Sequence, residues 1–162
     1  MHNHQAIMDV GGGMGALLEA MHKSGITSKL YLFDLPEVLN LLAPKAHSFQ
    51  TITGDFFKFV PQVADAIILS RVLHDWNDWK VAIILDKVYE ALPNDGKVYI
   101  LENLSDEIPE GLSLLSLNMM LMCNSYERTK GEYLNLLKES GFEFESALKI
   151  NTLQTLLVAR KP

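Results

Sequence analysis

The feature that most constrains the fold is a glycine-rich loop between a short apolar segment and a helix-like segment. Residues 6–10 predict a buried strand, residues 14–22 predict a helix with one apolar face, and DVGGGMG spans residues 9–15. Glycine permits positive φ and lets a ligand approach the backbone, while the following helix offers free N–H groups. In open parallel sheets, ligands bind beyond the carboxyl ends of the strands. The loop therefore predicts a binding site.

The rest of the chain alternates strand-like and helix-like segments. Further strands are expected at residues 29–33, 51–53, 65–70, 97–102, 142–150 and 152–159. Helices are expected at residues 36–42, from a cap at Asn77 or Asp78 to Leu92, and at residues 112–122 and 130–140. This order predicts one α/β domain over residues 1–162, with a Rossmann-like, doubly wound, mostly parallel seven-stranded sheet. The last two strands are expected to form an antiparallel pair.

Composition excludes several classes of function. The formal net charge is −6, and an acidic surface repels nucleic acid. Basic runs are absent, no apolar stretch approaches the ~20 residues that span a bilayer, and a signal peptide is not evident. The single cysteine, Cys123, can form no internal disulfide and is interpreted as a buried thiol. A cytoplasmic protein without nucleic-acid or membrane partners is expected.

The spacing of the glycines separates two classes of cofactor. Dinucleotide folds use G-x-G-x-x-G, whereas Gly11, Gly13 and Gly15 give G-x-G-x-G, with Asp9 just before them. S-adenosylmethionine has no phosphate and carries an ammonium group, which an acidic residue suits better than a pyrophosphate. The loop therefore favours S-adenosylmethionine over NAD, although a glycine turn can also serve packing alone.

Three further residues fit a nucleoside. Asp34 ends the second predicted strand, where a carboxylate can accept both ribose hydroxyls or cap the following helix. Asp55 and Phe56 follow the third strand, beside the expected adenine. There the carboxylate can accept from the exocyclic amine and the ring can cover the purine, although phenylalanines are often core residues.

Residues 70–78, SRVLHDWND, follow the fourth strand, where a methyltransferase places its acceptor. The Asn/Asp-Pro-Pro-aromatic run of many base-methylating enzymes is absent, which disfavours DNA adenine methylation. His74 can take the proton of an acceptor hydroxyl, since imidazole changes charge near neutral pH. A lone histidine is more often structural. No spacing of histidines typical of metal ligands is present, so a metal site is not expected.

Six segments together resemble one enzyme family. They are DVGGGMG, FDLP, GDFF, LSRVLHDWND, LEN and ERT, and they cover nearly the whole chain. The set resembles the plant-type small-molecule O-methyltransferases, which include caffeic acid, flavonoid, bacterial polyketide, carotenoid and acetylserotonin enzymes. The phrase SLNMM followed by YERT looks most similar to the acetylserotonin type and its bacterial relatives.

The resemblance implies a class I methyltransferase fold and metal-independent methyl transfer from S-adenosylmethionine to a hydroxyl of a small, phenolic or aromatic acceptor. His74 would be the general base, flanked and oriented by Glu102 and Glu127. With the residues read from the loop, the expected cofactor contacts are Asp9, Gly11, Gly13, Asp34, Asp55, Phe56 and Arg71. Asp75, Asn118, Met119 and Met122 are expected near the acceptor, with core packing an equal alternative for the two methionines.

One departure from the family concerns its N-terminal helical domain, which forms a homodimer and closes part of the acceptor pocket. The sequence lacks that domain, because the first strand begins at residue 6. A second hypothesis is therefore a fragment that binds S-adenosylmethionine without catalysis. A nicotinamide dehydrogenase is a third, disfavoured by the glycine spacing.

Overall fold

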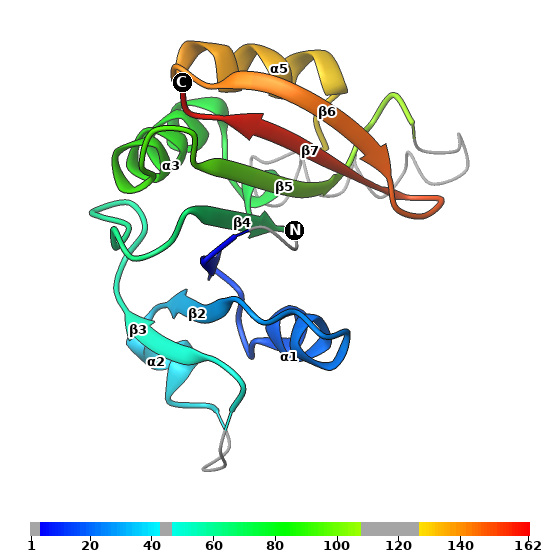
Figure 1. The fold of residues 1–162 in the computed structure, drawn as a ribbon. Helices are drawn as coiled ribbons and strands as arrows, with labels where there is room; N and C mark the ends of the chain where they lie inside the picture. The colour runs from blue at the N-terminus through cyan, green and yellow to red at the C-terminus, as the bar shows by residue number, and fades with distance from the viewer. Residues whose placement is uncertain (1–3, 43–46, 108–126) are drawn as a thin grey trace.

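The computed structural model describes residues 4–42, 47–107 and 127–162, which form a seven-stranded sheet with helices on both faces (Figure 1). The strands are β1 (Ala6–Val10), β2 (Lys29–Asp34), β3 (Gln50–Thr53), β4 (Ala66–Ser70), β5 (Lys97–Asn103), β6 (Glu143–Lys149) and β7 (Gln154–Arg160). The helices are α1 (Ala16–Lys23), α2 (Pro36–Leu39), the 3-10 helix η1 (Leu73–Asp75), α3 (Asp78–Ala91) and α5 (Lys130–Glu139).

The strand order is β3-β2-β1-β4-β5-β7-β6, and within this sheet β7 runs in the direction opposite to the other strands. The chain starts in the middle, builds outward to β3, and returns to place β4 on the other side of β1. This reversal of direction between β1 and β4 is the topological switch point at which open α/β sheets bind ligands. The predicted fold class, including the antiparallel C-terminal pair, is confirmed.

Alternating side chains of the central strands enter two separate cores. Met8, Ile67 and Ile100 pack with α3 and α5 on one face, while Ile7 and Ile68 pack with α1 on the other. β4 is buried along Ala66–Leu69, as its unbroken apolar run predicted. β6 is an edge strand with mostly exposed side chains, which accounts for the weak alternation in its sequence. The double burial fixes the central strands, and with them the loops at their carboxyl ends.

The first helix begins two residues later than predicted because of its glycine cap. Gly15 adopts a left-handed conformation with φ of 72°, so a right-handed helix can start only at Ala16. A Cβ at residue 15 would also collide with the ring of Phe49. The second predicted helix, at residues 36–42, is shorter than expected, because helical structure ends at Leu39. The predicted helix at residues 112–122 lies outside the described residues.

Two helices start at the side-chain caps that their sequences favour. Asn77 accepts a hydrogen bond from Lys80 N and begins α3, which decides between the two predicted caps. Thr129 accepts from Glu132 N, and the Glu132 carboxylate accepts from Thr129 N, which completes a capping box at α5. Both helices therefore begin at defined residues next to the segments that carry His74 and Glu127.

The capping box gives a prediction about stability. Thr129→Ala removes the hydroxyl that satisfies the first turn of α5, and should lower the free energy of unfolding by about 1 kcal/mol. Thr129→Ser keeps an oxygen at the same place and is the matched control. Urea denaturation of the three proteins measures the change, and equal midpoints for all three would contradict the prediction.

Candidate functional site

The predicted site residues gather at the carboxyl edge of the parallel strands. The glycine loop follows β1, Asp34 ends β2, Asp55 follows β3, His74 follows β4, and Glu102 lies near the end of β5. Because parallel strands end at one edge of the sheet, residues up to 93 positions apart in the sequence share one region. The topology therefore assembles one site from five segments.

Asp34 holds the glycine loop in place. Its Oδ2 accepts a hydrogen bond from Gly13 N at 2.8 Å, and its Oδ1 accepts from Leu35 N at 2.7 Å. Gly11 N donates to Phe33 O, which closes the loop against the end of β2. The Asp34 side chain is buried, yet each carboxylate oxygen has further acceptor capacity. The carboxylate thus fixes the loop and can still accept from a ligand.

Gly11 and Gly13 have different surroundings, because Gly13 faces open space and Gly11 packs against Val72 and Phe56. Gly13 has φ of 61°, and a Cβ at this position would meet nothing within 4 Å, so its surface faces open space. A Cβ at Gly11 would lie 3.0 Å from Val72 and 3.5 Å from the Phe56 ring. The loop backbone, the Phe56 ring and the start of the segment after β4 thus lie close together, as a nucleoside site requires.

Asp9 lies beneath the loop and not on its open surface. It is 1% exposed, and its Oδ2 occupies the space that a Cβ at Gly12 would need. Its Oδ1 has no hydrogen-bond partner among the described residues. Burial, followed by the charge of Asp34, raises the pKa of Asp9 to about 7. Asp9 was predicted among the cofactor contacts because an acidic residue near the loop suits an ammonium group. The structure places its side chain as a buried acceptor below the glycines, and the cofactor contact stays a prediction.

Asp55 and Phe56 lie at the end of β3. Asp55 Oδ1 accepts from Phe57 N at 2.9 Å, and its Oδ2 lies 3.4 Å from Lys58 Nζ. The Phe56 ring packs against the edge of Trp76 with 6.2 Å between the ring centroids. Phe56 therefore joins the glycine loop to the segment after β4.

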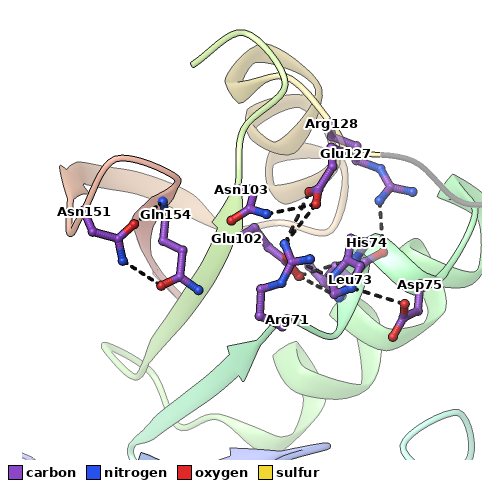
Figure 2. A network of polar contacts seen from close by, with 10 residues as sticks. All are labelled: Arg71, Leu73, His74, Asp75, Glu102, Asn103, Glu127, Arg128, Asn151 and Gln154. Carbon is purple, nitrogen blue, oxygen red and sulfur yellow. Dashed lines mark hydrogen bonds and ion pairs between the residues drawn. The ribbon is translucent and has the colours of Figure 1, made fainter. Parts of the chain in front are cut away.

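His74 and Glu102 form a buried pair (Figure 2). His74 Nδ1 lies 3.0 Å from Glu102 Oε2, and both side chains are buried. Glu102 Oε1 accepts from Leu73 N at 2.9 Å, so the same carboxylate holds the backbone of the turn that carries the histidine. A carboxylate can only accept, so in this contact Nδ1–H donates to Glu102.

Glu127 is linked to His74 through Arg71 and then Glu102. Arg71 Nη1 donates to Glu102 Oε2 and to Glu127 Oε1, each at 3.1 Å, and Asn103 Nδ2 donates to Glu127 Oε1. Glu127 makes no described hydrogen bond to His74. Sequence reasoning predicted that both glutamates flank the histidine and that Arg71 contacts a cofactor. In the structure Glu102 contacts His74 and Arg71 bridges the two carboxylates, while the catalytic roles and the cofactor contact of Arg71 stay predictions.

Arg71 is held in an uncommon backbone conformation. Its φ is 57°, which costs a residue other than glycine about 1 kcal/mol or more. Arg71 N donates to Leu101 O, so the pairing of β4 with β5 extends one residue beyond the strand. The left-handed turn directs the chain away from the sheet, and the next residues carry His74 beside Glu102.

Asp75 closes the other side of the imidazole. Its Oδ1 lies 3.2 Å from His74 Nε2, and its side chain is 60% exposed. The placement is consistent with the predicted position of Asp75 near an acceptor. Asn118, Met119, Met122 and Cys123 lie outside the described residues, so their predicted roles stay predictions.

Sequence reasoning missed two residues of this network, Asn103 and Arg128. Asn103 ends the LEN segment and contacts Glu127, and Arg128 directly follows Glu127 in the ERT segment. Arg128 is fully buried, which its charge gives no reason to expect. The available signal for both residues was that each directly follows a predicted site residue, Glu102 or Glu127, in the sequence.

One pocket lined by described residues lies elsewhere. Its volume is about 580 Å³, and it lies between the start of β2, the start of β3 and the end of α1, where Lys29, His47 and His22 contribute to its lining. That is the amino edge of the sheet, away from His74. We therefore locate the site by its converging polar groups and not by cavity size.

No helix among the described residues is long and apolar enough to cross a bilayer. No group of three or more His, Cys, Asp or Glu side chains among them is placed to hold a metal ion.

Comparison with known proteins gives one consistent result. Residues 1–143 match the family model described as the O-methyltransferase domain. The chain is 39% identical over 142 residues to myricetin 3'-O-methyltransferase 4 of Solanum lycopersicum, covering 83% of this chain and 39% of that protein. It is 36% identical over 162 residues to acetylserotonin O-methyltransferase of Homo sapiens, covering 94% of this chain and 47% of that protein.

Structural comparison agrees with the sequence matches. The crystal structure of human N-acetylserotonin methyltransferase in complex with SAM superposes with a TM-score of 0.88 at 34% identity, covering 98% of this chain and 48% of that chain. The chain therefore spans half or less of the length of these relatives.

The raised pKa of Asp9 predicts a pH-dependent stability. The folded pKa of about 7 exceeds the ordinary 3.8, so the folded state binds more protons between these values, and stability falls as pH rises through that window. Between pH 5 and pH 8, the free energy of unfolding of the wild type should fall by about 3 kcal/mol relative to that of Asp9→Asn, whose side chain has no proton to release.

Urea denaturation at the two pH values measures this difference. Asp86→Asn removes an exposed carboxylate and is the control, expected to follow the wild type. Parallel pH dependence of the wild type and Asp9→Asn would contradict a buried carboxyl with a raised pKa.

Proposed function

The chain belongs to the O-methyltransferase domain family, and on that premise we propose that it is the S-adenosylmethionine-dependent catalytic domain of a small-molecule O-methyltransferase. The observation that carries the proposal is the His74–Glu102 pair, which lies at the carboxyl edge of the sheet together with the glycine loop. It provides an oriented base close to a nucleoside site.

The loop and its carboxylates fit S-adenosylmethionine. Gly13 offers open backbone surface, Asp34 has acceptor capacity for ribose hydroxyls, and the Phe56 ring lies against Gly11, where it can cover an adenine. Asp9 lies beneath the glycines and would act on the cofactor through the loop backbone, and Asp55 can accept from the purine amine. When bound, S-adenosylmethionine supplies a sulfonium methyl as the electrophile.

His74 serves as the general base through Nε2. Because Nδ1–H donates to Glu102, the lone pair of the neutral imidazole is on Nε2. The hydroxyl proton would move to this nitrogen as the acceptor oxygen bonds to the methyl carbon, and the carbon–sulfur bond would break with S-adenosylhomocysteine as the leaving group. Glu102 stabilises the imidazolium that forms, as a buried carboxylate does in other histidine-based sites. Most of the remaining rate gain comes from alignment of the reacting groups.

Arg71 and Glu127 set the charge around this pair. Arg71 compensates the negative charges of Glu102 and Glu127, which would otherwise repel each other across the site. Asp75 contacts Nε2 in the free protein and must turn aside to admit a hydroxyl, which its exposure permits. After proton transfer, it can accept from the new Nε2–H.

We propose an aromatic hydroxyl as the acceptor. Two relatives are named for methylation of acetylserotonin and myricetin. An imidazole base is well matched to a phenol, which ionises far more readily than an aliphatic alcohol.

Cofactor binding gives the first test. Calorimetry should show binding of S-adenosylhomocysteine to the wild type, and Asp34→Ala should weaken it by about 10- to 100-fold through loss of charge-assisted hydrogen bonds. Glu37→Gln changes an exposed carboxylate three residues away and should leave the affinity unchanged. Tight binding of NADH with no response to S-adenosylhomocysteine would support a dehydrogenase instead.

Methyl transfer gives the second test. His74→Ala should lower kcat by about 10²- to 10⁴-fold toward a panel of phenols that includes acetylserotonin and flavonols, with the affinity for S-adenosylhomocysteine retained. His22→Ala removes an exposed histidine at the far edge and is the control. Unchanged turnover in His74→Ala would refute the assigned base. Cofactor binding without turnover in the wild type would support a binding fragment.

A further inference from the structure

Arg128 is a buried charge that the proposed chemistry does not use. It lies between Glu127 and the cap of α5, its side chain is fully buried, and its guanidinium reaches the turn that carries His74 (Figure 2). We infer that Arg128 is a positioning residue that fixes His74 for proton transfer by fastening this turn at both ends. The inference rests on the proposed function of His74 as the base.

The guanidinium contacts both sides of the catalytic turn. Nη1 donates to Leu73 O at 3.0 Å, and Nη2 donates to Trp76 O at 2.6 Å, so the two carbonyls enclose His74 and Asp75. Nε donates to Asp78 Oδ1 at 2.9 Å, at the start of α3. Three donor nitrogens of one rigid group therefore set the distance between the start and the end of η1 and its junction with α3.

These contacts meet a need of the local backbone. A 3-10 helix of three residues leaves most of its carbonyls without partners inside the helix. Leu73 O already accepts from Trp76 N, and Arg128 provides a second donor, while Trp76 O receives Nη2. A buried guanidinium is costly without partners and stable with several acceptors, so the arginine and the turn depend on each other.

Neighbouring residues fasten the same turn from the other side. Arg128 O accepts from Ser105 N at 2.9 Å, which ties this segment to the chain just beyond β5. Glu127 binds Arg71, at the start of the segment after β4. The adjacent side chains of Glu127 and Arg128 thus hold residues 71 and 73–78, and the Glu102 contact sets the imidazole between them.

The geometry distinguishes a positioning role from a general contribution to the core. Lysine can keep the positive charge but presents one nitrogen, so it cannot reproduce three bonds in a fixed plane. If Arg128 acts only through charge and burial, lysine should retain the position of His74. If its planar shape sets the turn, lysine should lose catalysis while keeping the fold.

The experiment compares Arg128→Lys and Arg128→Met with the wild type. NMR of the imidazole nitrogens follows the Nδ1–H of His74, which is identified by its absence in His74→Gln. In the wild type this buried proton should exchange slowly with solvent, and in both variants it should exchange faster. The kcat of both variants should fall by about 10²-fold, as for small misplacement of a reacting group. The affinity for S-adenosylhomocysteine should stay within about twofold, because Arg128 makes no described contact with the glycine loop.

Arg160→Met is the matched control. Arg160 pairs with Asp95 and Glu143 at the opposite end of β7, so its loss removes ion pairs without touching the catalytic turn. It should leave the His74 signal and kcat unchanged, even if it lowers the midpoint of thermal unfolding.

The outcomes separate this inference from the proposed function. An unchanged His74 signal and unchanged kcat in folded Arg128→Lys would overturn the positioning role, and this variant also decides the matter if Arg128→Met does not fold. If the wild type methylates no acceptor, the proposed function fails, while the NMR comparison still tests whether Arg128 positions the imidazole. If kcat falls equally in Arg128→Lys and Arg160→Met, general destabilisation is the cause and the inference is wrong.

Discussion

The candidate site depends on the buried carboxylate of Glu102. It accepts from the imidazole of His74, from the guanidinium of Arg71 and from the backbone N–H of Leu73. A fully buried carboxylate is stable only with such donors. The hydrogen bonds that stabilise Glu102 at the end of β5 are therefore the same ones that orient His74. Loss of one donor would leave a buried charge less compensated and would shift the others.

A second carboxylate organises the glycine loop in the same way. Asp34 fixes Gly13 through its backbone N–H and keeps acceptor capacity toward the open side of the loop. Its charge also helps to keep Asp9 protonated near neutral pH, because two buried carboxylates at close range repel. The two halves of the site thus follow one rule, in which an acid near the end of a parallel strand holds the loop after its neighbour.

The segment after β4 joins these halves. It lies against the loop through Val72, binds Glu102 through its backbone, and is held by Arg128 from beyond β5. A short 3-10 turn has little stability of its own, so its shape is imposed by partners from three other segments. The chemistry proposed for His74 is therefore a property of the assembled edge of the sheet.

The sequence by itself determined the order of strands and helices and the position of the glycine loop, because these depend on local spacing and residue type. Its resemblance to a known family led to the hypothesis that His74 is a base and Glu102 its acid partner. The sequence placed Asp34 and Glu102 at strand ends because apolar runs end there. It could not determine that Arg71 bridges Glu102 and Glu127, that Asp9 lies beneath the loop, or that Arg128 fastens the turn. The contacts of Arg71 and Arg128 join residues 31 to 56 positions apart, and only the packing of strands and helices decides which buried donor meets which acceptor.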